Sequence, residues 1–204
     1  MQRWRLITAP TTTPISLQEA KDHLYVTSDS YNGEIKNKLL AAVDYCQRRI
    51  PGHAQFCTAT YELVLHEFPD SDRHTDVPIT LRPPPVQKIT SIRYYNSTGG
   101  LTYYGSSNGS TASSTTYTLV TETDGPASVE PVFGQTWPAT REVPDAVMVR
   151  FTAGYASQAA LPGSIKEAVK LKLEHLHDPE RVDEIKMERA IDSLLAGVGY
   201  GHYS

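Results

Sequence analysis

Hydrophobic residues near the start of the chain recur with the spacing of an α-helix. From residue 35 to residue 50 the apolar positions lie three or four residues apart, and Pro51-Gly52 ends the pattern. The positions on this face are Ile35, Leu39, Val43, Cys46 and Ile50. Before them, Ser16-Leu17-Gln18-Glu19 matches a capping box and predicts a short helix that runs to about Tyr25.

The same periodicity returns after residue 160. Ser164-Ile165-Lys166-Glu167 has the form of a second capping box, and Asp178-Pro179-Glu180 predicts the start of a last helix that ends before Gly197. The first of these two helices carries the apolar stripe Ile165, Val169, Leu173 and Leu176, and the second carries Val182, Ile185, Ile191, Leu194 and Leu195. We expect the face of residues 35–50 to pack on the stripe around Val169, Leu173 and Leu176.

Between the helical segments the apolar residues alternate, which is typical of β-strands. TYELVLHEF (60–68) places Leu63 and Leu65 on one side, and AVMVRF (146–151) places Val147, Val149 and Phe151 together. Residues 79–95 predict two strands separated by Pro83–Pro85, and residues 116–133 predict another strand with a turn at Asp124-Gly125. The Ser/Thr/Gly-rich residues 96–116 indicate a long hairpin arm or loop.

Together these patterns predict an α+β protein. Residues 1–55 form an N-terminal arm and helices, residues 56–159 form a β-rich insertion that is a sheet or a small barrel, and residues 160–204 form C-terminal helices and a tail. We expect the helices of the two ends to pack together as a helical bundle, with the β-rich segment inserted in the middle.

Composition and charge exclude several classes of protein. The net charge of −4, from 19 basic and 23 acidic residues, offers no basic run for nucleic acid. No segment approaches the roughly 20 apolar residues of a membrane span, and the N-terminus lacks the apolar core of a signal peptide. Cys46 and Cys57 are the only cysteines, too few for a disulfide framework. We expect a soluble intracellular protein with two reduced thiols and no membrane partner.

Candidate catalytic and metal-binding motifs are weak. His175 and His177 lie two apart on a predicted helix and point to different faces, so they cannot share a metal. The acidic residues 70–76 lack the turn glycine of a calcium loop, since Thr75 stands there. The glycines of residues 197–201 follow a helix, whereas a phosphate loop precedes one. We therefore expect no enzyme activity, no metal and no cofactor.

The order of several short motifs resembles a known family. The chain contains PISLQEAKDHL, then YELVLHEFP, RPPPVQKITSIRYYN, QTWP, VMVRFTAGY and LPGSIKEAVKLKLEH, spanning roughly Pro14 to His177. This series resembles the head-tail connector proteins of tailed bacteriophages, the neck adaptors. The resemblance implies a dodecameric ring in the virion neck that docks under the portal protein, offers its lower face to a tail completion or stopper protein, and is assembled in the host cytoplasm. Packaged DNA would pass through the lumen without specific binding.

The resemblance also implies roles for individual residues. Trp137-Pro138 and residues 151–155 become scaffold residues that join sheet to helix, and an interface role for Trp137 stays open. The last helix and tail, from about Ile185 to Ser204, become the portal-binding element. Its candidate contact residues are Ile185, Ile191, Leu194, Leu195, Val198, Tyr200, His202 and Tyr203.

Two other functions remain as alternatives. The twelve tyrosines and the polar arm at residues 96–116 also suit a β-rich module that binds carbohydrate or peptide. Such a module would act as a monomer or small oligomer, whereas an adaptor is defined by ring assembly. A hydrolase of unrecognised type would require a convergent nucleophile and base, which the sequence does not reveal.

Overall fold

The computed structural model describes residues 2–50, 52–69, 77–105, 116–121 and 126–198. The described residues form four α-helices and eight strands in two antiparallel sheets, which confirms the α+β class. The chain divides into two units. One, here called the β unit, comprises Met1–Ala9 and Thr58–Gly154, and the other, the helical unit, comprises Pro10–Cys57 and Tyr155–Ser204.

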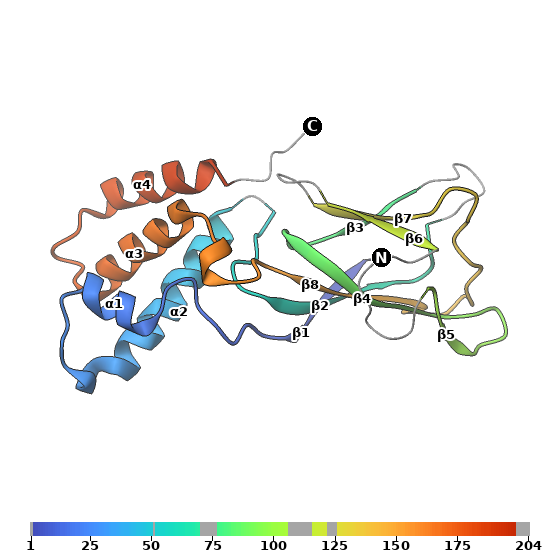
Figure 1. Cartoon of the computed structure of the whole chain (residues 1–204), viewed down its shortest axis with the longest axis horizontal. Helices are drawn as coiled ribbons and strands as arrows, with labels where there is room; N and C mark the ends of the chain where they lie inside the picture. Colours follow the sequence, from blue (N-terminus) through green and yellow to red (C-terminus); the bar gives the residue numbers. More distant parts are fainter. Residues whose placement is uncertain (1, 51, 70–76, 106–115, 122–125, 199–204) are drawn as a thin grey trace. The chain divides into compact units, whose positions relative to one another are not determined.

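The helical unit contains helices from both ends of the chain (Figure 1). They are α1 (Leu17–His23), α2 (Asn32–Arg49), α3 (Gly163–His177) and α4 (Glu184–Ala196), with short 3-10 turns at Asp29–Tyr31 and Gln158–Ala160. The capping box of α1 is confirmed. Ser16 Oγ accepts a hydrogen bond from the Glu19 amide at 3.1 Å, and Glu19 Oε2 accepts one from the Ser16 amide at 2.7 Å.

The starts of α3 and α4 differ from the prediction. Helix α3 begins at Gly163, and the carbonyl of Pro162 accepts the first backbone hydrogen bond of the helix. Ser164 therefore lies inside the first turn and makes no capping box. Helix α4 begins at Glu184, because Asp178 and Arg181 first close a turn and Asp183 then caps the helix. Val182 therefore precedes the last helix.

One hydrophobic core joins the helices of the helical unit, and it confirms the predicted packing of the first long helix on α3. Ile35, Leu39 and Ile50 are buried in the same cluster as Val169 and Leu173. Val43 and Leu176 are partly buried at its margin, and α4 adds Met187, Ile191 and Leu195. The shared core explains why segments more than a hundred residues apart in sequence form one unit.

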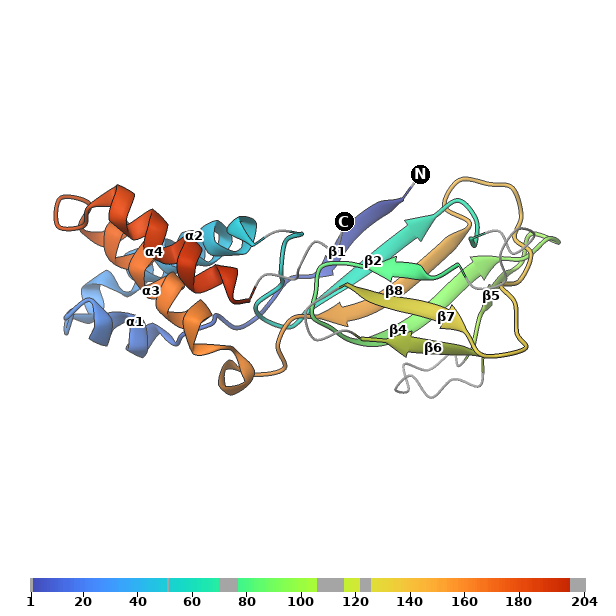
Figure 2. The ribbon, with the colours of Figure 1, turned by 90° about the horizontal axis from the view of Figure 1, so that it is seen from above.

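The β unit contains both sheets (Figure 2). The five-stranded sheet has the order β1 (Arg3–Thr8), β2 (Ala59–Leu65), β8 (Val147–Ala153), β4 (Val86–Tyr95) and β5 (Leu101–Tyr103). The three-stranded sheet has the order β3 (Ile79–Leu81), β7 (Ala127–Pro131) and β6 (Tyr117–Val120). The predicted turn at Asp124-Gly125 and residues 106–115 of the polar arm lie outside the described residues.

The predicted sides of the apolar strand residues are confirmed, although β2 is buried on both faces from Glu62 to Leu65 and does not alternate there. Leu63 and Leu65 of β2, and Val147, Val149 and Phe151 of β8, are buried in one cluster with residues of the three-stranded sheet, such as Leu81 and Val129. The two sheets therefore bury their apolar faces against a common core. Gly154 ends the β unit with φ of 101°, a left-handed conformation that suits glycine at this corner.

Two features of the β unit differ from the sequence-based prediction. The sequence pattern groups residues 1–9 with the helices, but β1 pairs with β2 and brings them into the β unit.

Trp137 is predicted to join sheet and helix. Its described contacts lie within the β unit: its ring stacks on Phe68 at 4.8 Å, and Nε1 donates a hydrogen bond to the Val77 carbonyl at 3.2 Å. With 7% of its surface exposed, Trp137 is a core residue of the β unit.

Candidate functional site

The hydrophobic residues of α4, predicted to contact a partner, divide by burial. Ile191 and Leu195 lie in the core of the helical unit, and Leu194 and Val198 are partly buried against it. Ile185 alone of the described candidates is largely exposed, at 65%. Tyr200, His202 and Tyr203 lie outside the described residues. Among the described candidates, Ile185 therefore offers the most exposed apolar surface.

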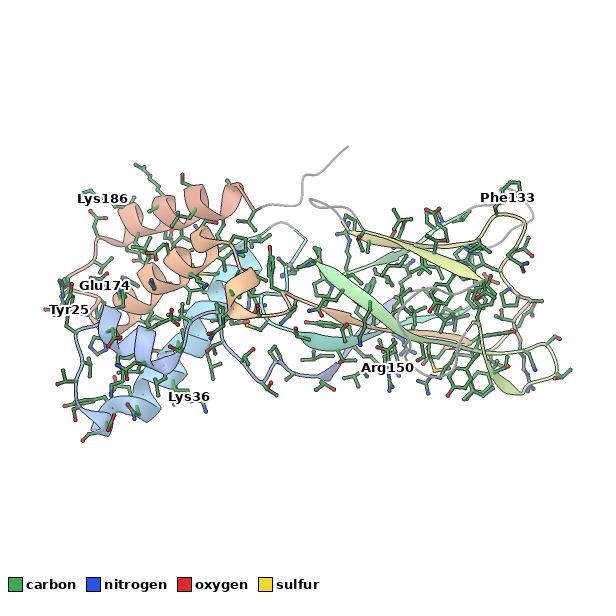
Figure 3. All side chains as sticks on the ribbon, viewed as in Figure 1. Tyr25, Lys36, Phe133, Arg150, Glu174 and Lys186 are labelled. Carbon is green, nitrogen blue, oxygen red and sulfur yellow. The ribbon has the colours of Figure 1, made fainter. Side chains whose placement is uncertain are left out.

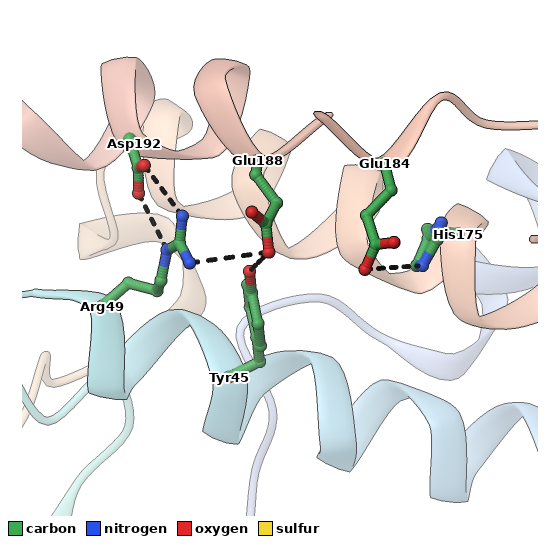
Figure 4. A network of polar contacts seen from close by, with 6 residues as sticks. All are labelled: Tyr45, Arg49, His175, Glu184, Glu188 and Asp192. Carbon is green, nitrogen blue, oxygen red and sulfur yellow. Dashed lines mark hydrogen bonds and ion pairs between the residues drawn. The ribbon is translucent and has the colours of Figure 1, made fainter. Parts of the chain in front are cut away.

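Polar contacts between α4 and α2 lie beside the buried face of α4 (Figure 4). Arg49 donates two hydrogen bonds to the Asp192 carboxylate, both at 2.8 Å, and Tyr45 donates one to Glu188 at 2.8 Å. The pKa of Tyr45 is raised to about 12. Burial is the largest cause, and the hydrogen bond to Glu188 is the second. Tyr45 therefore stays protonated at physiological pH and keeps donating its hydrogen bond to Glu188. This bond and the two from Arg49 attach α4 to α2.

A shallow cavity of about 420 Å³ lies on the outside of α2 and α3. Lys172 is 8% exposed, and its Nζ lies 4.1 Å from the centre of the Tyr45 ring. The ring face stabilises the ammonium group, which explains how a lysine is accommodated at a buried position. The cavity is lined by Ala41, Asp44, Tyr45, Arg48, Arg49, Lys172 and Leu176.

The described titratable groups of the helical unit show no metal-binding arrangement. His175 Nε2 lies 4.0 Å from Glu184 Oε1. Across the part of the chain that the structure describes, no group of three His, Cys, Asp or Glu side chains could hold a metal ion. Cys46 and Cys57 are buried free thiols, and burial raises the pKa of Cys46 to about 12. A thiol that stays protonated is a poor nucleophile, so Cys46 acts as a packing residue.

The outer face of the five-stranded sheet carries arginines that the sequence analysis did not single out. Arg93 of β4 and Arg150 of β8 donate hydrogen bonds to the same oxygen of Glu62 at 2.8 and 2.9 Å, and Glu62 is 5% exposed. Beside them, Arg3 and Arg5 of β1 both contact Asp145. Each carboxylate therefore faces two guanidinium groups, which leaves a local positive charge on a chain that is acidic overall.

Replacing Glu62 with glutamine is expected to destabilise the β unit by about 1–3 kcal/mol, because a neutral amide cannot balance two guanidinium groups at a buried position. Arg93 and Arg150 keep side-chain exposures of 23% and 34%, so water moderates the loss. Urea unfolding followed by tryptophan fluorescence measures it. Glu142→Gln, at an exposed position, is the matched control. Equal stability of the two variants would contradict a structural role for the Glu62 cluster.

Of the helices in the described residues, none has the length and apolar character that a membrane crossing requires. The chain matches no protein-family model and no curated protein sequence.

Three solved structures share the fold. A chain in the neck of an empty gene transfer agent particle, computed with C6 symmetry, has a TM-score of 0.71 and 20% identity, and the match covers 99% of this chain and 97% of that one. A chain in the native neck, computed with C12 symmetry, has a TM-score of 0.71 and 21% identity over 99% and 97%. A chain in the native virion has a TM-score of 0.67 and 21% identity over 94% of each. The expected likeness to a neck protein is thus confirmed at the level of the fold, which extends over nearly the whole length of both chains.

Proposed function

We propose that this chain is a structural head-tail adaptor that forms a ring in the neck of a phage-like particle. The observation that carries the proposal is the match to chains in gene transfer agent necks. It covers 99% of this chain, and so includes both units, and 97% of each neck chain. A match confined to the β unit would have favoured a binding module instead. The protein acts by assembly, with no enzymatic step.

The symmetry of the similar necks supports a ring of twelve copies. A twelve-fold ring also obeys six-fold symmetry, so one dodecamer is compatible with necks computed in C12 and in C6. We propose the portal protein as the partner above the ring and a tail completion or stopper protein as the partner below it. Packaged DNA passes through the lumen, held by no sequence-specific contact.

We propose that α4 and the residues after it form the portal contact, with Ile185 as the exposed apolar residue on the helix. The polar contacts from Arg49 and Tyr45 keep α4 rigid, which lowers the entropic cost of docking. Figure 3 shows the side chain of Lys186, next in sequence, pointing outward from the same helix. The buried residues Ile191 and Leu195 support this surface from below.

Removing residues 199–204 is expected to leave the melting temperature unchanged and to reduce docking on portal-bearing heads about tenfold or more, as loss of anchoring aromatic residues does at other interfaces. Val198 stays in the truncated protein because it packs on the core. A variant with a Gly/Ser tail of equal length tests whether side chains or mere length matter. Electron microscopy of heads mixed with each protein counts the attached rings.

Normal docking by both tail variants would place the portal contact elsewhere, and Ile185→Lys then tests the helix alone. A wild-type chain that forms no ring, either free or on portal-bearing heads, would contradict the adaptor function. If that monomer bound carbohydrate or peptide, the alternative of a binding module would replace it.

A further inference from the structure

Strand β1 is an open edge of the five-stranded sheet. It pairs with β2 on one side, and it stands at the end of the strand order. All six of its residues, RWRLIT, are exposed. The other edge strands of the two described sheets are shorter: β5 and β3 have three residues each, and β6 has four. An edge strand offers unpaired backbone N–H and C=O groups, and β1 offers the longest such row among the described strands.

The apolar face of the sheet continues onto β1 without a cover. Trp4 lies opposite Leu63 and Leu6 lies opposite Tyr61, so both side chains lie on the face that is buried further into the sheet. Leu63 is fully buried, whereas Trp4 is 38% and Leu6 53% exposed. The Trp4 ring meets Phe151 edge-on with centroids 6.1 Å apart, so Trp4 borders the core directly. The core of the β unit therefore ends in an exposed apolar margin.

The opposite face of β1 holds the strand in place. Arg3 and Arg5 both form ion pairs with Asp145, which lies just before β8. These contacts bridge β1 to the connection that leads into the third strand of the sheet. Because the ion pairs add to the pairing with β2, the edge is held in register before any partner arrives, and less entropy is lost on binding.

We propose that β1 is the pairing edge through which a second copy of this chain adds to the β unit, with Trp4 and Leu6 as its buried anchors. The inference rests on the proposed ring. A closed ring requires a head-to-tail contact between two different patches of identical subunits, and it places a second copy beside every subunit. Strand addition at an open edge supplies affinity through the backbone, and Trp and Arg are the residues most enriched at interface centres.

The chemistry of this edge favours a protein partner. Arg3, Arg5 and Asp145 together carry a charge of +1, since two cations face one carboxylate. Two copies of this chain, each of net charge −4, repel overall, so these cations add to binding only where they meet acidic side chains of the neighbour. DNA is also acidic, but a phosphate backbone gains nothing from Trp4 and Leu6, whose exposed apolar surface fits a protein partner.

Leu6→Lys tests the proposal. Because Leu6 is 53% exposed, the variant is expected to keep the melting temperature of the wild type, while a lysine cannot be buried under a second copy in place of the leucine anchor. We expect ring assembly, free in solution and on portal-bearing heads, to require about tenfold more protein or to fail. Leu6→Ile should assemble normally. Leu40→Lys, at a 48% exposed residue of α2 and away from every described strand edge, is the matched control and should also assemble.

Tryptophan quenching gives a second readout that needs no variant. The chain has two tryptophans, and Trp137 is 7% exposed, so acrylamide quenching of the monomer reports mainly on Trp4. Ring formation is expected to protect Trp4 and to reduce the quenching.

Each other result overturns the inference in a distinguishable way. Normal rings from Leu6→Lys, or rings in which Trp4 is quenched as in the monomer, would overturn the inference and leave the adaptor function intact. Rings of Leu6→Lys that assemble but fail to join the tail would assign β1 to another neck protein. Absence of any wild-type ring would remove both the inference and the proposed function.

Discussion

Replacing Phe151 by alanine is expected to destabilise the β unit by about 3–5 kcal/mol, the usual cost of deleting a buried phenylalanine ring. Phe151 is fully buried on β8, which has β2 and β4 as its neighbours in the sheet, and its ring packs against Trp4 and Tyr61. The cavity left by the ring would lie at the centre of the sheet, where neighbouring strands cannot close it. Urea unfolding followed by tryptophan fluorescence measures the effect, because Trp4 and Trp137 both belong to the β unit.

Phe133→Ala is the matched control. Phe133 lies between β7 and β8 and is fully exposed, and Figure 3 shows its ring pointing away from the ribbon. The same chemical change there should alter the free energy of unfolding by no more than about 0.5 kcal/mol. Similar losses for the two variants would contradict the position assigned to Phe151 in the core.

Leu39→Ala is expected to cost about 2–5 kcal/mol in the helical unit. Leu39 is 2% exposed on α2 and shares the cluster that contains Val169 and Leu173 of α3, so its loss opens a cavity between segments from the two ends of the chain. Unfolding followed by far-ultraviolet circular dichroism reports on the helices. The neighbouring Leu40, 48% exposed on the same helix, gives the control Leu40→Ala, which should be nearly neutral. A neutral Leu39→Ala would mean that α2 does not pack on α3 through this face.

The elements with a long or regular apolar pattern could be predicted from the sequence. Helix α2 repeats its apolar positions over four turns, and β8 has an apolar residue at every second position from Val147 to Ala153, so both patterns exceed the noise of local composition. The burial of Leu39 and Phe151 follows from those patterns alone.

Strand β1 could not be predicted in the same way. Its first four residues alternate Arg with Trp and Leu, but Ile7 breaks the alternation, and an exposed edge strand has no buried face to impose a clear contrast. Its assignment depends on pairing with β2, more than fifty residues later. The start of α3 was missed for a different reason: Pro162 makes the entry into the helix, so the Ser164 to Glu167 spacing matched a capping box by chance.

The candidate interface on α4 stays a prediction, and what the structure adds is the burial of its described residues. Helical periodicity identifies the apolar residues but cannot say which of them face the chain's own core, and Ile191 and Leu195 do. Of the described candidates, Ile185 is the one whose side chain lies largely exposed at the surface. The arginines around Glu62 could not be grouped from the sequence, because they come from separate strands. A net charge summed over the whole chain also conceals a local excess of positive charge.

The division of each unit into separate chain segments has a consequence for synthesis on the ribosome. Helices α1 and α2 emerge early, yet the core that covers Ile35 and Leu39 requires α3, and residues 58–154 are made in between. The β unit can complete its sheets once Gly154 has emerged, whereas the helical unit must wait for the last forty residues or so of the chain. During that interval the apolar face of α2 is covered only in part, by α1 and the residues beside it, and a nascent subunit is then most exposed to aggregation and most dependent on chaperones.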